Sequence, residues 1–250
     1  MPVLRSLLHM VWMLLTVIPV ALVLLCAAGL RINGKRLYRI AVFWLGLAIS
    51  GARYILGIRY VVEGRENLPA PGQPAVLLVK HQSTYETFLM PVIMPNDLAY
   101  VFKRELLYVP FFGWAIGCLD MVHIDRKLKS QAFNKVVQQG RELLARGIWV
   151  IMFPEGTRIA RGQSGKYKSG GARLAIETGV PVIPVAVNSG VCWPRKAFVK
   201  YPGTVTVSIG PMISSQGRQA DELMGEVQCW IEHEMRRLDP TAYAQEVNRA

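Results

Sequence analysis

The N-terminal part of the chain differs from the rest in its pattern of hydrophobic and polar positions. Residues 7–30 contain one His and no charged side chain, and as a helix they are long enough to cross the hydrocarbon of a bilayer. Residues 40–58 are also mostly apolar, but Arg53 interrupts them. The Asn-Gly pair at 33–34 between the two segments is a turn signal. The pattern predicts a membrane-embedded helical hairpin over residues 1–60.

Other interpretations of this hairpin are a signal peptide and a membrane span. A signal peptide would have Arg5 as its charged start, but the apolar run is too long and a second one follows it. A second span would bury Arg53 at mid-bilayer, at a cost of about 3 kcal/mol or more. We therefore expect both helices to dip into one leaflet, with a single span of the first helix as the alternative. Candidate interfacial anchors are Trp12, Trp44, Tyr38, Tyr54 and Tyr60.

From residue 60 onward, short apolar runs alternate with amphipathic stretches, which is typical of an α/β fold. The expected strands are 59–63, 75–79, 98–102, 121–124, 148–153, 182–187 and 204–209. The expected helices are 84–92, 104–107, 111–118, 130–146, 168–178 and 218–238. The prediction is a mixed central sheet flanked by helices over residues 61–240, preceded by the two-helix membrane-anchoring motif and followed by a C-terminal tail, 241–250.

The charge of the chain suggests an anionic partner. The formal net charge is +12, and residues 1–62 supply +7 of it because they contain no Asp or Glu. Nucleic acid and an anionic bilayer both attract such a chain. The apolar context of the basic residues favours the bilayer, and the lack of interleaved aromatic residues disfavours nucleic acid. The four cysteines lie far apart without a CxxC pair, so neither a metal site nor a disulfide framework is expected.

The segment Lys-His-Gln-Ser-Thr-Tyr-Glu at 80–86 directly follows an apolar strand. Its His81 lies where open α/β sheets place ligands, and histidine suits proton transfer near neutral pH. Glu86 reaches His81 only if His81 lies in a turn and Glu86 in the first turn of the next helix. A purely structural interpretation is also open, because Ser83 and Glu86 form the pattern of a helix capping box.

A second segment, Phe-Pro-Glu-Gly-Thr-Arg at 153–158, also follows an apolar strand. Gly156 allows a tight turn there, and Arg158 has the forked donors that hold a phosphate. The residues that follow, 160–173, are rich in glycine and basic residues. They fit the phosphates of a substrate or of coenzyme A, although a solvated basic loop is the plainer interpretation. Lys103 and Arg126 are candidate phosphate ligands at two further strand ends, or else ordinary surface cations.

These segments, in this order and spacing, resemble the glycerolipid acyltransferase family, in particular the bacterial 1-acyl-glycerol-3-phosphate acyltransferases. The resemblance covers roughly residues 60–210 and the N-terminal hairpin. It implies that His81 is the base, with Glu86 in the place of the family's aspartate. It also implies that the residues of the later segments bind the glycerol phosphate: Lys103, Arg126, Glu155, Gly156, Thr157 and Arg158.

The implied reaction transfers a fatty acyl group from an acyl-coenzyme A or acyl carrier protein thioester to lysophosphatidic acid, without a cofactor or metal. The implied location is the inner, cytoplasmic membrane among membrane lipids, with residues 61–240 as an acyltransferase domain on the cytoplasmic face. The alternatives are an acyltransferase for another lyso-lipid or for glycerol 3-phosphate, and a catalytically inactive protein that binds anionic lipid.

Overall fold

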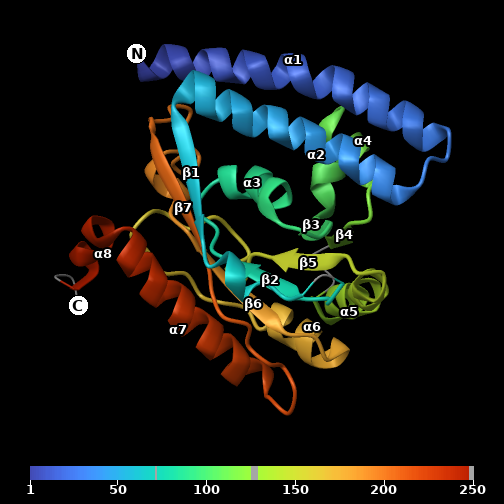
Figure 1. Cartoon of the computed structure of the whole chain (residues 1–250), viewed down its shortest axis with the longest axis vertical. Coiled ribbons are helices and arrows are strands. Elements are labelled where there is room, and N and C mark those ends of the chain that lie inside the picture. Colours follow the sequence, from blue (N-terminus) through green and yellow to red (C-terminus); the bar gives the residue numbers. More distant parts are fainter. Residues whose placement is uncertain (71, 125–128, 248–250) are drawn as a thin grey trace.

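A central sheet with helices on both faces forms the molecule in the computed structural model, which describes residues 1–70, 72–124 and 129–247 (Figure 1). The strands are β1 (Ile58–Glu63), β2 (Val76–Val79), β3 (Leu98–Lys103), β4 (Val122–Ile124), β5 (Trp149–Met152), β6 (Val182–Val187) and β7 (Gly203–Ile209). Their order in the sheet is β1-β7-β6-β2-β5-β3-β4. All neighbours are parallel except β6 and β7, so the predicted mixed sheet is confirmed. Each expected strand lies within one residue of its observed bounds.

The helices follow the predicted amphipathic stretches, with one addition at the C-terminus. They are α1 (Pro2–Gly29), α2 (Gly34–Gly51), α3 (Tyr85–Ile93), α4 (Phe112–Gly117), α5 (Lys129–Ala145), α6 (Gly170–Thr178), α7 (Ala220–Leu238) and α8 (Pro240–Val247). The expected helix 104–107 is a 3-10 helix, Arg104–Tyr108. The expected tail after Pro240 instead begins as α8, because Tyr243 is buried in the core beside α7 and proline suits the first position of a helix.

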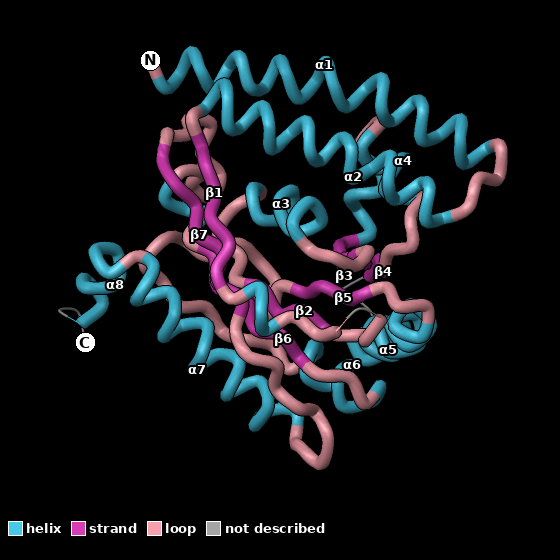
Figure 2. The backbone as a smooth tube through the Cα atoms, in the orientation of Figure 1, coloured by secondary structure: helices cyan, strands magenta, loops and turns pink. Residues whose placement is uncertain are grey.

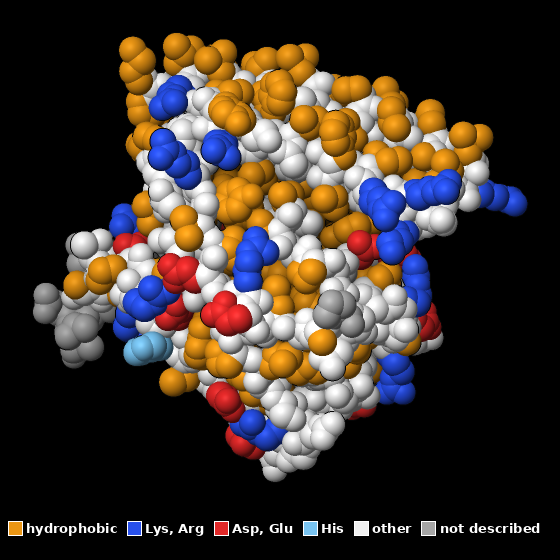
Figure 3. Space-filling view, in the orientation of Figure 1, with side chains coloured by type: hydrophobic (Ala, Val, Ile, Leu, Met, Phe, Trp, Pro, Cys, Tyr) orange, Lys and Arg blue, Asp and Glu red, His pale blue; other side chains and the backbone are white. Residues whose placement is uncertain are grey.

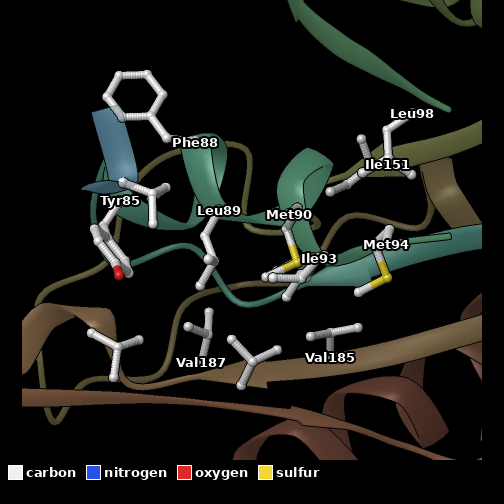
Figure 4. Close-up of a cluster of buried hydrophobic side chains, with 14 of the residues drawn as sticks. Tyr85, Phe88, Leu89, Met90, Ile93, Met94, Leu98, Ile151, Val185 and Val187 are labelled. Carbon is white, nitrogen blue, oxygen red and sulfur yellow. The ribbon is translucent and has the colours of Figure 1, made fainter. Parts of the chain in front are cut away.

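Side chains on the two faces of the sheet enter two separate cores. In β2, Leu77 and Val79 face the core beneath α2 and α3, whereas Val76 and Leu78 face the core beneath α5, α6 and α7. This alternation is the two-residue period of a strand. Figure 2 shows the two helical layers on either side of the strands. Figure 4 shows side chains of α3 pointing toward Val185 and Val187 of β6.

The N-terminal hairpin is built into the body of the protein. A π-helix, Ala52–Leu56, continues α2. The core above α3 contains Trp44 and Ala48 of α2 and Leu56 of the π-helix. Trp44 Nε1 donates to Thr16 Oγ1 at 3.2 Å, and Trp12 Nε1 donates to the Leu47 carbonyl at 2.9 Å. These two tryptophans therefore join α1 to α2. Trp44 is buried, so it is not the expected interfacial anchor, whereas Trp12 is partly exposed and its role as an anchor stays a prediction. Their ring nitrogens have found partners inside the protein.

The outer face of α1 is an exposed apolar stripe. Its exposed hydrophobic residues recur at helical spacing: Val3, Leu4, Leu7, Leu8, Met10, Val11, Leu14, Leu15, Ile18, Leu22 and Val23. Figure 3 shows hydrophobic side chains gathered along this edge, with Lys and Arg side chains below both ends. The two helical segments Pro2–Gly29 and Gly34–Leu56 are long and apolar enough to cross a membrane, by length and composition. The outer stripe of α1 stays free of the body.

Candidate active site

Four parallel strands end at one edge of the sheet and bring distant segments together there. Because β6, β2, β5 and β3 are parallel, the residues after each strand meet at this edge. His81 follows β2, the segment 153–158 follows β5, Ser189 follows β6, and Lys103 ends β3. The histidine therefore lies between segments that come from far apart in the sequence.

The position of His81 is fixed by contacts to its backbone and its ring. Its N–H donates to Oε2 of Glu155 at 2.8 Å, and its carbonyl accepts the N–H of Ile159 at 2.7 Å. The imidazole stacks on Phe153, with the ring centroids 3.8 Å apart and the planes 13° from parallel. The segment after β5 thus holds His81 on both sides of its backbone and on one face of its ring.

Glu86 lies in the first turn of α3 and bonds to both His81 and the start of the helix. Its Oε1 lies 2.9 Å from His81 Nδ1 and accepts the N–H groups of Gln82 and Ser83, each at 2.7 Å. Its Oε2 accepts the hydroxyl groups of Ser83 at 2.8 Å and Ser189 at 2.5 Å. The side chain is fully buried, and all of these partners are donors to an ionised carboxylate.

The protonation state of Glu86 decides the tautomer of His81. Burial raises the pKa of Glu86, but the hydrogen bonds from His81, Ser189 and the Ser83 N–H outweigh burial and lower the pKa below its ordinary value. An ionised Glu86 can only accept hydrogen bonds, so His81 Nδ1 carries a proton and donates it to Glu86. The lone pair of the neutral imidazole is therefore on Nε2, the nitrogen that is able to act as a base.

Arg158 lies beside the same turn. Its Nη1 donates to Thr84 Oγ1 at 2.9 Å, three residues after His81 in the chain. Gly156, two residues earlier, has a φ of +67°, which residues other than glycine rarely adopt. A Cβ added there would lie 2.9 Å from Lys168 Nζ. Two cationic side chains, Arg158 and Lys168, thus border the turn next to His81. This combination of a proton acceptor and cations fits a phosphorylated alcohol.

Comparison with known proteins identifies the family. The family model for acyltransferases matches residues 59–188, just over half of the chain. A 1-acyl-sn-glycerol-3-phosphate acyltransferase of Pseudomonas aeruginosa is 46% identical over 200 residues, which are 79% of this chain and 77% of that one. The chain belongs to the acyltransferase family. The resemblance inferred from the sequence is confirmed.

Other members of the family are similar over most of this chain. A 1-acyl-sn-glycerol-3-phosphate acyltransferase alpha of Mus musculus is 32% identical over 181 residues, covering 72% of this chain and 63% of its own. The crystal structure of the 1-acyl-sn-glycerophosphate acyltransferase PlsC of Thermotoga maritima has the same fold. It matches with a TM-score of 0.78 and 23% identity, over 96% of this chain and 98% of that one.

Family membership does not assign roles to single residues, so those roles stay predictions. Among the expected phosphate ligands, Lys103 is exposed at the end of β3 and Thr157 is exposed in the turn after β5. Arg126 lies outside the residues that the structure describes. Glu155 is buried and its carboxylate is held by the protein, 2.7 Å from Lys80 Nζ and 2.8 Å from the His81 N–H. This placement directs Glu155 toward the base and away from solvent.

The basic loop after Arg158 is more engaged with the protein than its sequence suggested. Arg161 forms a two-point ion pair with Asp239, at 2.6 Å and 2.8 Å. Arg173 lies over the ring of Phe133, 3.9 Å from its centroid. Lys166 and Lys168 are exposed. The lysines of this loop are therefore better placed than its arginines to meet a substrate phosphate.

The sequence interpretation missed two residues that contact the His81–Glu86 pair. Ser189 bonds to Glu86 from a position 103 residues further along the chain. Phe153 stacks on the imidazole, a contact that its place in the segment 153–158 did not by itself predict. Its position directly before the Pro-Glu-Gly turn was a usable signal once both segments were assigned to one sheet edge. A single serine in a loop carried no such signal.

Proposed function

We propose that the chain transfers a fatty acyl group from an acyl thioester to the sn-2 hydroxyl of 1-acylglycerol 3-phosphate, which gives phosphatidic acid. The observation that carries the proposal is the position of Arg158, which bonds to Thr84 in the same turn that holds His81 and Glu86. A guanidinium there binds the phosphate of an acceptor whose hydroxyl reaches Nε2 of His81. The activities for which the Pseudomonas and mouse relatives are named support the same substrate.

In the proposed mechanism, His81 is the general base. Nε2 takes the proton of the sn-2 hydroxyl while its oxygen attacks the thioester carbonyl carbon. The Glu86 carboxylate stabilises the imidazolium that forms. The carbon–sulfur bond then breaks, the ester is complete, and the imidazolium returns its proton to the leaving thiolate. Coenzyme A and acyl carrier protein thioesters both fit this chemistry, and neither requires a cofactor or metal.

An acceptor competition assay tests the proposed reaction. The purified chain is given an acyl thioester with lysophosphatidic acid, glycerol 3-phosphate or a zwitterionic lyso-lipid, and the esterified product and the free thiol are both measured. We expect the highest kcat/KM with lysophosphatidic acid. A higher kcat/KM with either other acceptor would overturn the acceptor assignment, and the absence of thiol release with all three would favour the inactive lipid-binding alternative.

We further propose that the outer stripe of α1 lies in the cytoplasmic leaflet of the inner membrane. Three features support this location: the exposed apolar stripe, the basic groups at its ends, and the packing of α2 into the body. A helix that contributes Trp44 and Leu56 to the protein core is not surrounded by lipid. Acyl thioesters are cytosolic, so the sheet edge with His81 has to face that side.

Vesicle binding and topology test this location. Leu15→Lys places a charge in the stripe, and Gln216→Lys places the same charge in the exposed loop before α7. Since burying a leucine contributes about 1.5–3 kcal/mol, we expect Leu15→Lys to weaken binding to anionic vesicles about tenfold or more. Gln216→Lys should not weaken it. Equal binding by both variants, or an N-terminal tag that is accessible only from outside the cell, would contradict the leaflet location.

A further inference from the structure

A fully buried lysine, Lys80, precedes His81 in the chain. Its Nζ lies 2.7 Å from Glu155 Oε1, 2.7 Å from Glu232 Oε1 and 3.3 Å from the Gln163 carbonyl. Because side chains alternate along a strand, Lys80 points to the opposite face of the sheet from His81, toward α7. A lysine buried without partners would be very costly, so these contacts are the reason that it is tolerated.

Lys80 is connected to His81 through Glu155. One oxygen of the Glu155 carboxylate forms an ion pair with Lys80, and the other accepts the His81 N–H. Burial raises the pKa of Glu155, and the neighbouring Lys80 counteracts this rise. If Glu155 took up a proton on Oε2, that oxygen would become a hydroxyl group. A hydroxyl accepts the His81 N–H less well than a carboxylate oxygen does. The ammonium of Lys80 therefore favours the form of Glu155 that holds the base.

The second partner, Glu232, connects Lys80 to the C-terminal part of the chain. Glu232 lies in α7, 152 residues after Lys80, and its Oε1 also accepts the Tyr167 hydroxyl at 2.8 Å. Among the described residues, Glu232 forms no hydrogen bond with His81 or Glu155, and its negative charge acts on Glu155 only by raising the pKa of that carboxyl. It contributes to the burial of Lys80 but does not touch the backbone of the base.

We propose that Lys80 is a positioning residue for the acyl transfer reaction, acting through Glu155 to fix the backbone of His81, with Glu232 as its structural anchor. This inference rests on the proposed function, because His81 is the base only in that reaction. It also gives Glu155 a positioning role in place of the phosphate-binding role implied by the resemblance. A displacement of about 1 Å at a catalytic group lowers turnover by about a hundredfold.

Two double variants separate positioning from structural support. Lys80→Met should lower kcat about 10- to 100-fold, with the KM for lysophosphatidic acid within about twofold of the wild type. Adding Glu155→Gln should restore much of kcat, because the neutral amide needs no ammonium and its oxygen still accepts the His81 N–H. Adding Glu232→Gln, the matched control, should restore thermal stability but not kcat. Unchanged kcat in Lys80→Met, or equal effects of the two added changes on kcat, would overturn the proposal.

Single variants of Glu155 keep the proposal testable if Lys80→Met does not fold. Glu155→Gln retains an acceptor for the His81 N–H and Glu155→Leu does not, so kcat should be higher for Gln, with equal KM. A raised KM with unchanged kcat in both would mean that Glu155 contacts the substrate, and would overturn the positioning role. Wild-type turnover with lysophosphatidic acid tests the proposed function separately. If the wild type prefers another acceptor, the same kcat comparison is made with that acceptor.

Discussion

His81 Nδ1 and Glu86 Oε1 lie 2.9 Å apart, and the same Glu86 oxygen accepts the N–H groups of Gln82 and Ser83 in the turn just before α3. The catalytic and capping interpretations of this segment are therefore compatible in the structure. Ser83 takes part in the cap, because its Oγ accepts the N–H of Tyr85 at 2.9 Å and donates to Glu86. The Glu86 carboxylate thus orients the imidazole of His81 and also caps the N-terminus of α3, the helix that contains Glu86.

Replacement of Glu86 should therefore affect activity and stability together. Glu86→Ala removes the partner of His81 and a helix cap worth about 1 kcal/mol, so we expect a lower kcat and a Tm lower by several degrees. Glu86→Asp should stay partly active, and Glu86→Gln should lower kcat less than His81→Ala does. Steady-state kinetics and thermal unfolding measure the two effects. A loss of Tm with unchanged kcat would leave only the capping role.

Replacement of His81 should reduce activity far more than stability. General bases contribute about 10²–10⁴-fold to turnover, and we expect His81→Ala to lose that factor while the variant still folds and binds membranes. Its Tm should fall by a few degrees, as for Ser189→Ala, because the buried Glu86 loses one hydrogen bond. Turnover of the purified variant, normalised to folded protein, is the measurement. More than about a tenth of wild-type turnover in His81→Ala would contradict the role as base.

Arg158 and Lys103 should govern the affinity for the phosphorylated acceptor. A charge-assisted hydrogen bond to phosphate contributes about 1.5–3 kcal/mol, so Arg158→Ala and Lys103→Ala should each raise the KM for lysophosphatidic acid about tenfold or more. Thr84→Val is the matched variant for Arg158, since it removes the hydroxyl that accepts from Nη1 and retains the guanidinium. It should raise KM by a smaller factor. An unchanged KM in both charge-removing variants would refute the assignment.

The stability contributed by Ser189 should depend on pH. The pKa of Glu86 is lower in the folded protein than its ordinary value of 4.5, so its hydrogen bonds stabilise the fold fully above about pH 4.5. That contribution is lost as the pH falls through the lower, folded-state pKa. Ser189→Ala removes one of these bonds and should cost about 1.5–3 kcal/mol at neutral pH. Unfolding measured from pH 7 to pH 3 should show the difference from the wild type shrink below pH 4.5, and a constant difference would contradict it.

Local patterns predicted the strands and the His81–Glu86 pair because both depend on neighbours in the sequence. Each strand of the parallel core is a short run of buried apolar residues, and Glu86 lies one turn from His81. Ser189 and Glu232 reach the site from 103 and 152 residues away, and no local pattern fixes which loop or helix face meets it. Trp44 of the hairpin was misassigned for the same reason. Trp44 has the composition of a membrane anchor, and only the tertiary structure shows that it packs against α1 and α3.

Only Gly57 separates the π-helix that ends at Leu56 from β1, which begins at Ile58. This single residue leaves no room for a hinge or a flexible linker between the hairpin and the sheet. In addition, α1 contacts the loop before β7, where Ser6 Oγ accepts the Lys200 N–H at 2.9 Å. Deleting residues 1–56 to obtain a shorter enzyme would therefore uncover the core above α3 and expose Phe88, whose ring packs against Trp44 of α2. With the proposed leaflet location, the height of His81 above the lipid plane would be fixed when the chain folds, and lipid substrates would have to diffuse laterally to it.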